Sequence, residues 1–199
     1  MSLPPTPGTA AQPDLTGLAE PPLPPIAEGV VSLHDGRIVH VRPVVPGDAV
    51  LLARGVKEAD ADTLYHRFFN PAIKLDSRRL RYLTDIDYEK RFALAAFADG
   101  EGVAIARFEP AAGGVAEVAV VVKPEWRRLG LATEMFALLE EAALERGVVE
   151  FEALYLPDNH AIERVLEKRG FRDVTVDSGV ARVTKKLRER FTYREHPSH

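Results

Sequence analysis

The chain has no cysteine, so disulfides, thiolate metal sites and cysteine nucleophiles are all excluded. It also lacks an apolar run of the roughly 18 residues that a membrane helix requires. Its N-terminus has neither the basic nor the apolar region of a secretion signal. A formal net charge of -4 gives no general attraction to nucleic acid or anionic membranes. We therefore expect a cytoplasmic protein with neither nucleic acid nor membrane as a partner.

The 199 residues suffice for one domain with a substantial core. Residues 1–25, however, hold eight of the fifteen prolines, and such a segment buries too little apolar surface to offset its ordering entropy. We expect a disordered proline-rich arm over residues 1–30, a folded domain over residues 31–187 and a loose tail over residues 188–199.

Strand-like and helix-like segments alternate through the folded part. Alternation and β-branched content predict strands over residues 38–44, 92–97, 103–108, 115–123, 151–156, 173–176 and 181–187. Apolar spacing and capping residues predict helices over residues 48–57, 62–69, 76–83, 131–146 and 159–169. This order indicates an α/β (α+β) protein with a mixed sheet flanked by helices.

The most informative stretch is a strand that runs into a short basic loop and then a helix. The strand carries Glu117, and the loop follows as Arg127-x-x-Gly130-x-Ala132. A helix that starts here presents unpaired N–H groups and the positive end of its dipole, an arrangement that suits a pyrophosphate. Small residues at 130 and 132 let the backbone approach the phosphate closely. A tight strand–helix turn with a packing glycine is the structural alternative.

These features resemble the GNAT N-acetyltransferase superfamily, whose signature at this turn is Gln/Arg-x-x-Gly-x-Gly/Ala. The resemblance covers roughly residues 31–187. Three further segments together resemble the catalytic domain of bacterial Pat-type protein lysine acetyltransferases. They are Asn159 with the later Lys168-x-Gly170-Phe171 of the last helix, Ala116-Glu117-Val118-Ala119, and Arg67-Phe68-Phe69 ahead of Leu83-Thr84-x-x-Asp87-Tyr88. The resemblance implies a mixed, mostly antiparallel twisted sheet of about seven strands, splayed at the fourth and fifth strands.

The resemblance also implies acetyl-CoA as the acyl donor. The strand end at residues 120–122 would bind the pantetheine arm and the thioester carbonyl, and the loop at residues 128–133 would bind the pyrophosphate. The cofactor-binding residues implied in this way are Val120, Val121, Val122, Arg127, Arg128, Leu129, Gly130, Leu131, Ala132, Thr133 and Asn159.

Glu117 is the candidate catalytic residue. Strand alternation places it on one face with Ala119 and Val121, so it needs a partner, an opening or a function there. A lysine amine with a pKa of about 10.4 is neutral in only about one molecule in 2,500 at pH 7, so a base that removes its proton assists attack. Pat-type domains use a glutamate at this position. A structural carboxylate satisfied by a nearby arginine is the alternative.

Three positions bear on how far the resemblance extends. Many GNAT enzymes have a tyrosine in the last helix that protonates the departing thiolate, whereas this chain has Leu166, which leaves the general acid unassigned. Arg127 stands where Pat-type domains usually have glutamine. Asn159 is equally a good helix N-cap.

No second histidine or carboxylate stands at metal-ligand spacing, so no metal is expected.

The sequence thus predicts an acetyl-CoA-dependent N-acetyltransferase. The resemblance implies a protein substrate that presents a lysine, such as an acyl-CoA-forming enzyme, and a monomer or homodimer. One alternative is an enzyme that acetylates small-molecule amines. A second is a noncatalytic acyl-CoA-sensing module, which would bind the donor without turnover.

Overall fold

The computed structural model of the chain describes residues 29–70, 73–111 and 115–187. The expected disordered arm, up to residue 28, and the expected loose tail over residues 188–199 lie outside the described residues. Within them, no helix combines the length and the apolar character needed to cross a membrane.

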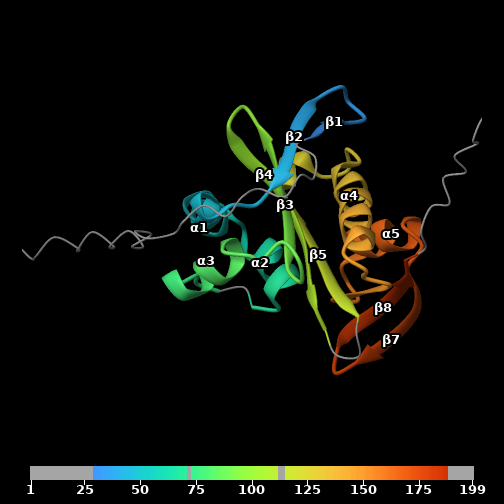
Figure 1. The fold of residues 1–199 in the computed structure, drawn as a ribbon. Helices are drawn as coiled ribbons and strands as arrows, with labels where there is room; N and C mark the ends of the chain where they lie inside the picture. The colour runs from blue at the N-terminus through green and yellow to red at the C-terminus, as the bar shows by residue number, and fades with distance from the viewer. Residues whose placement is uncertain (1–28, 71–72, 112–114, 188–199) are drawn as a thin grey trace, which may run out of the picture.

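One sheet of eight strands runs through the described chain (Figure 1). Its spatial order is β1-β2-β3-β4-β5-β6-β8-β7, and every neighbouring pair is antiparallel except β5 and β6. The strands are β1 (Gly29–Ser32), β2 (Ile38–Pro43), β3 (Phe92–Ala98), β4 (Glu101–Pro110), β5 (Ala116–Val122), β6 (Glu150–Tyr155), β7 (Arg172–Asp177) and β8 (Val180–Lys186). The predicted mixed, mostly antiparallel sheet is confirmed.

The strand beyond the expected seven is β1, which forms a hairpin with β2 around the turn at residues 33–37. Leu33 N–H donates to the Arg37 carbonyl at 2.8 Å, and Gly36 takes the positive φ of 86° that closes the turn. Because β1 comes first, the strands expected as fourth and fifth are β5 and β6 here.

Helices cover both faces of the sheet (Figure 1). On one face α4 packs against β3, β4 and β5, and α5 packs against α4. On the other face α1 contacts β4 and α2 contacts β5, while α3 packs against α1. The helices are α1 (Ala49–Glu58), α2 (Ala61–Phe68), α3 (Ser77–Thr84), α4 (Leu131–Glu145) and α5 (His160–Lys168), with short 3-10 turns at η1 (Pro46–Asp48) and η3 (Pro124–Trp126).

Polar side chains begin three of these helices. Asp60 accepts from Thr63 N–H at 2.7 Å to start α2, and Asp76 accepts from Arg79 N–H at 2.8 Å to start α3. Asn159 accepts from Ile162 N–H at 3.2 Å to start α5. Each bond satisfies a backbone donor that the first turn would otherwise leave unpaired.

The main core lies between α4 and the sheet. Phe92, Phe108 and Phe151 form a row across three strands, with ring centroids 5.8 and 5.9 Å apart. Phe108 pairs with Val118 on β5, and both are buried. Since side chains alternate along a strand, Glu117 points to the opposite face, toward α1, α2 and α3.

The strands β5 and β6 pair over a very short length. Their register contains two pairs, Ala116 with Phe151 and Glu117 with Glu152. Each strand continues along its other partner, β5 to Val122 beside β4 and β6 to Tyr155 beside β8. Beyond Glu117 the two strands therefore diverge, as the splayed sheet predicts, and an opening forms between them.

Candidate functional site

A groove of about 760 Å³ occupies the opening between β5 and β6. Its walls come from both strands, α2, the loop after β5, the N-terminal part of α4 and the whole length of α5. Ligand pockets commonly have volumes of about 300–1,000 Å³. The groove brings together these residues predicted from sequence: Glu117, Val120, Val121, Val122, Arg127, Arg128, Gly130, Leu131, Ala132, Thr133 and Asn159. Leu129 is not among the lining residues.

The N-terminus of α4 points its backbone donors into this groove. The bond of Glu134 N–H to the Gly130 carbonyl, at 3.1 Å, is the first of the helix. The N–H groups of Leu131, Ala132 and Thr133 precede it and have no partner within the helix. Arg128, Arg164 and Lys168 add cationic side chains to the same groove. This end can hold a phosphate-bearing ligand.

Gly130 is favoured by its backbone conformation, and a side chain there would displace the ring of His34. Its φ is 91°, in the left-handed region, and a Cβ there would lie 2.8 Å from Nε2 of His34. The backbone of His34 is fixed in turn, because its N–H donates to the Leu129 carbonyl at 3.1 Å. The β1–β2 turn thus supports the loop that begins α4, and Leu129 serves in that support through its carbonyl.

Arg127 connects the loop to two other elements. Its Nε donates to the Val122 carbonyl at 3.1 Å, and its Nη2 donates to Oγ1 of Thr63 at 2.7 Å. The Thr63 hydroxyl donates onward to Asp60 at 2.7 Å. Because the Arg127 guanidinium bonds to Thr63 on α2 and to Val122 on β5, it holds α2 against the end of β5.

Three carboxylates form a row across the sheet at the closed end of the groove. Glu109 on β4 pairs in register with Glu117 on β5, which pairs with Glu152 on β6. Side chains at directly paired positions have Cβ atoms about 4.5–5.5 Å apart, so the three acids are neighbours on one face.

The outer two carboxylates have partners, and the middle one does not. Glu109 forms an ion pair with Nε of Arg107 at 2.7 Å and accepts a hydrogen bond from the Tyr82 hydroxyl. Glu152 is buried and accepts a hydrogen bond from Arg182. Glu117 makes no hydrogen bond or ion pair with any residue in the described part of the chain.

The surroundings of Glu117 favour its protonated form. Burial raises the pKa of this half-buried carboxyl most strongly, and the charges of Glu152 and Glu109 raise it further. The guanidiniums of Arg67 and Arg182 oppose this by lowering the pKa. A carboxylate whose pKa is raised holds a captured proton more firmly, which suits it to act as a base.

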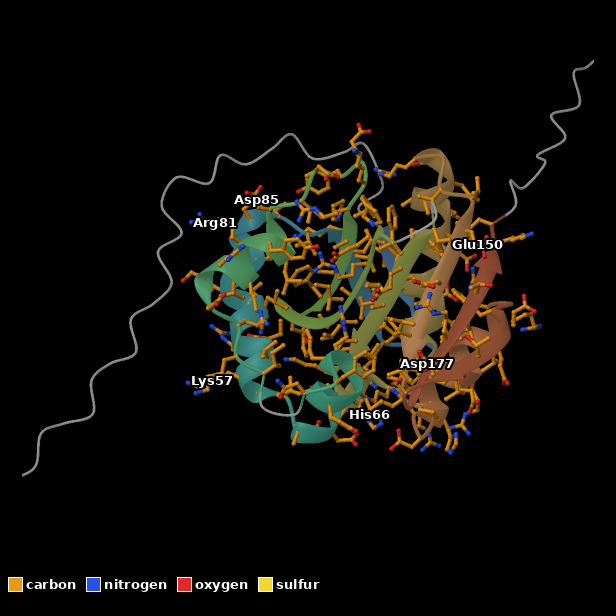
Figure 2. All side chains as sticks on the ribbon, turned by 90° about the horizontal axis from the view of Figure 1, so that it is seen from below. Lys57, His66, Arg81, Asp85, Glu150 and Asp177 are labelled. Atoms are coloured by element: carbon orange, nitrogen blue, oxygen red, sulfur yellow. The ribbon has the colours of Figure 1, made fainter. Side chains whose placement is uncertain are left out.

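His66 joins α2 to the turn before α5. Its Nε2 lies 3.3 Å from Oδ1 of Asp158, and its Nδ1 lies 3.0 Å from the Asp62 carbonyl. Figure 2 labels His66 on α2, on the side of that helix facing the later strands. His66, Asp62 and Asp158 all line the groove, so this contact connects its two walls.

Asn159 and Leu166 are the two positions at α5 that the sequence analysis singled out. Asn159 caps α5 through its side chain and also lines the groove, so the capping role is confirmed. Leu166 is 2% exposed and offers no proton donor. No group of three or more His, Asp or Glu that could hold a metal ion is present among the described residues.

A splayed mixed sheet, a helix N-terminus facing the opening and an unpaired carboxylate at its closed end together define an acyl-CoA-dependent transferase. A sequence model described as the acetyltransferase (GNAT) family matches residues 60–171. The chain belongs to the GNAT family of acetyltransferases, and acetyl-CoA as the acyl donor follows from this membership.

Individual relatives agree with the family. The chain is 32% identical over 155 residues to the acetyltransferase Pat of Mycolicibacterium smegmatis, covering 75% of this chain and 46% of that protein. The chain thus spans about half the length of this relative. The GNAT domain of S. lividans PAT matches with a TM-score of 0.76 and 29% identity, covering 80% of this chain and 97% of that domain. A Salmonella typhimurium protein solved with its cofactor acetyl-CoA shares the fold, with a TM-score of 0.59 and 20% identity over 77% of this chain and 96% of that one.

Sequence reasoning did not find the residues that surround Glu117. Glu109 and Glu152 each share its strand face only through register with a neighbouring strand. The bond between Thr63 and Arg127 joins residues 64 positions apart. Alternation within the hairpin of β4 and β5 is the signal that could have paired Glu109 with Glu117.

The row of carboxylates makes a prediction about titration. Glu152→Gln removes a negative charge and should lower the pKa of Glu117, whereas Arg67→Gln removes a positive charge and should raise it. The measurement is a carbon-detected NMR titration of the Glu117 carboxyl in each variant. Glu101→Gln, an exposed acid on β4 paired with Arg54, should leave the pKa unchanged. Shifts of the same sign in the first two variants would contradict this electrostatic description.

The close approach of His34 to Gly130 makes a prediction about stability. Gly130→Ala should lower the free energy of unfolding by more than Gly147→Ala, measured by urea denaturation. Both positions have positive φ, which costs about 1–2 kcal/mol for alanine, but a Cβ at Gly147 meets nothing within 4 Å. Adding His34→Ala to the Gly130→Ala variant should remove the additional loss of unfolding free energy. Equal losses at the two glycines would show that the contact with His34 has no energetic consequence.

Proposed function

We propose that this chain transfers the acetyl group of acetyl-CoA to the side-chain amine of a protein lysine, with Glu117 as the general base. The observation that carries the proposal is the position of Glu117, an unpaired carboxylate with a raised pKa where β5 and β6 begin to diverge. A donor in the groove would have its phosphates near the N-terminus of α4 and its thioester toward Glu117.

In the proposed reaction, the acceptor nitrogen attacks the thioester carbonyl carbon. A carbon–nitrogen bond forms, and the nitrogen loses its proton to Glu117, directly or through a water. Backbone N–H groups of the strand end at residues 120–122 stabilise the oxyanion, and Arg127 fixes this strand end through the Val122 carbonyl. The carbon–sulfur bond then breaks. With Leu166 in place of a donor, the CoA thiolate leaves unassisted, since a thiol has a pKa of about 8.5.

Two features support a protein lysine as the acceptor. The groove rim includes the exposed side chains of Asp62, Phe69 and Asp158, which a folded partner could contact directly. Their two carboxylates and the row at Glu117 favour a cationic side chain. The similarity to the acetyltransferase Pat and to the GNAT domain of S. lividans PAT supports the same class of acceptor.

The test measures CoA release from acetyl-CoA with a thiol reagent, which reports CoA alone because the chain has no cysteine. An acyl-CoA synthetase, a panel of small primary amines and no acceptor are compared. Glu117→Gln should lower kcat/KM on the protein by about 10²-fold or more while leaving the affinity for acetyl-CoA unchanged. Glu101→Gln serves as the matched control and should keep wild-type activity.

Three outcomes would contradict the proposal. Turnover confined to small amines would identify a small-molecule acetyltransferase. Tight binding of acetyl-CoA without CoA release for any acceptor would favour a sensing module. Wild-type turnover in Glu117→Gln would remove the assignment of the base.

A further inference from the structure

A second cavity, of about 340 Å³, lies between the sheet face that carries Glu117 and the helices α1, α2 and α3. Its walls are mainly apolar and include Leu51, Leu52, Val56, Leu64, Ile105 and Val121. The exposed side chains of Glu58 and Glu125 also line it, so the cavity opens to the surface. Its volume lies at the lower end of the range for ligand pockets.

This cavity adjoins the groove described above. Thr63, Arg67, Ala119 and Val121 line both spaces. Ala119 and Val121 project from the same face of β5 as Glu117, so the cavity begins on the side of the strand where the acyl group would react. The substituent on a thioester carbonyl near residues 120–122 would have this space next to it.

The cavity wall also carries charged side chains of both signs, which are Arg67, Arg107, Lys123, Asp48, Glu58, Asp60 and Glu125. Arg107, which is 5% exposed, and Arg67 both line the cavity and would repel an ammonium group. The carboxylate of Asp60, at its edge, is already bonded to Thr63. An uncharged hydrocarbon chain matches the apolar walls between these charges.

We propose that this cavity receives the acyl chain of the donor, so that the enzyme accepts acyl-CoA with straight apolar chains of about four to six carbons besides acetyl-CoA. This inference rests on the proposed function for the orientation of the donor. It adds a binding site for the chain beyond the reacting carbonyl, and the transfer step itself is unchanged.

The test is calorimetric binding of CoA, acetyl-CoA, butyryl-CoA and hexanoyl-CoA, which requires no acceptor. Burying one methylene group is worth about a fourfold gain in affinity, so hexanoyl-CoA should bind at least about tenfold more tightly than acetyl-CoA. Affinities for acetyl-CoA and hexanoyl-CoA within about twofold of each other would overturn the proposal.

Matched substitutions on α1 locate the effect. Val56→Phe should fill the cavity and remove most of the gain for hexanoyl-CoA while changing acetyl-CoA affinity less than about twofold. Val50→Phe is the control, because Val50 is 50% exposed on the same helix and does not line the cavity. An equal loss in both variants, or an equal loss for both ligands, would overturn the proposal.

A second variant guards against misfolding of Val56→Phe. Gly55 lines the same cavity, and a Cβ there meets nothing within 4 Å. Gly55→Leu should therefore add volume with little strain and give the same selective loss.

In parallel transfer assays, chain-dependent binding without any transfer would contradict the proposed function alone. Acetyl transfer with chain-independent binding would contradict this inference alone.

Discussion

The short pairing of β5 with β6 is the constraint on which the site depends. Two residue pairs join these strands, while each strand keeps a longer antiparallel ladder with its outer neighbour. The sheet therefore stays continuous and still opens after Glu117. If the parallel ladder continued, β6 would occupy the space into which the groove extends. The opening is thus a consequence of strand register, and the same register places Glu117 at its closed end.

The opening between β5 and β6 is surrounded by cationic side chains and by carboxylates. The groove wall includes the N-terminus of α4 and the cations Arg128, Arg164 and Lys168, which favour a phosphate. At the closed end, Glu117 lies between two carboxylates that form ion pairs with Arg107 and Arg182. Burial beside these acids raises the pKa of Glu117, while Arg67 limits the rise. One groove thereby contains both backbone donors with cationic side chains and a carboxylate without a partner among the described residues.

The features predicted from sequence are those set by local signals. Alternation located the strands, apolar spacing and caps located the helices, and the turn at Gly130 located the loop that begins α4. The side of β5 to which Glu117 points also followed from alternation. Its relation to Glu109 and Glu152 did not, because it depends on register between separate strands. The bond from Arg127 to Thr63 likewise requires α2 to be placed over β5, which no local pattern specifies.

The central claim is that the opening between β5 and β6 binds the acyl donor with its thioester next to Glu117. A crystal structure of the complex with acetyl-CoA tests this most directly. The account predicts the pantetheine arm between residues 118–122 and 153–155, and the pyrophosphate within hydrogen-bond distance of the N–H groups of Leu131, Ala132 and Thr133. It also predicts room for one amine, or an amine and a water, between the acetyl carbon and Glu117. A donor bound outside this groove, or an acetyl group directed away from Glu117, would contradict the account.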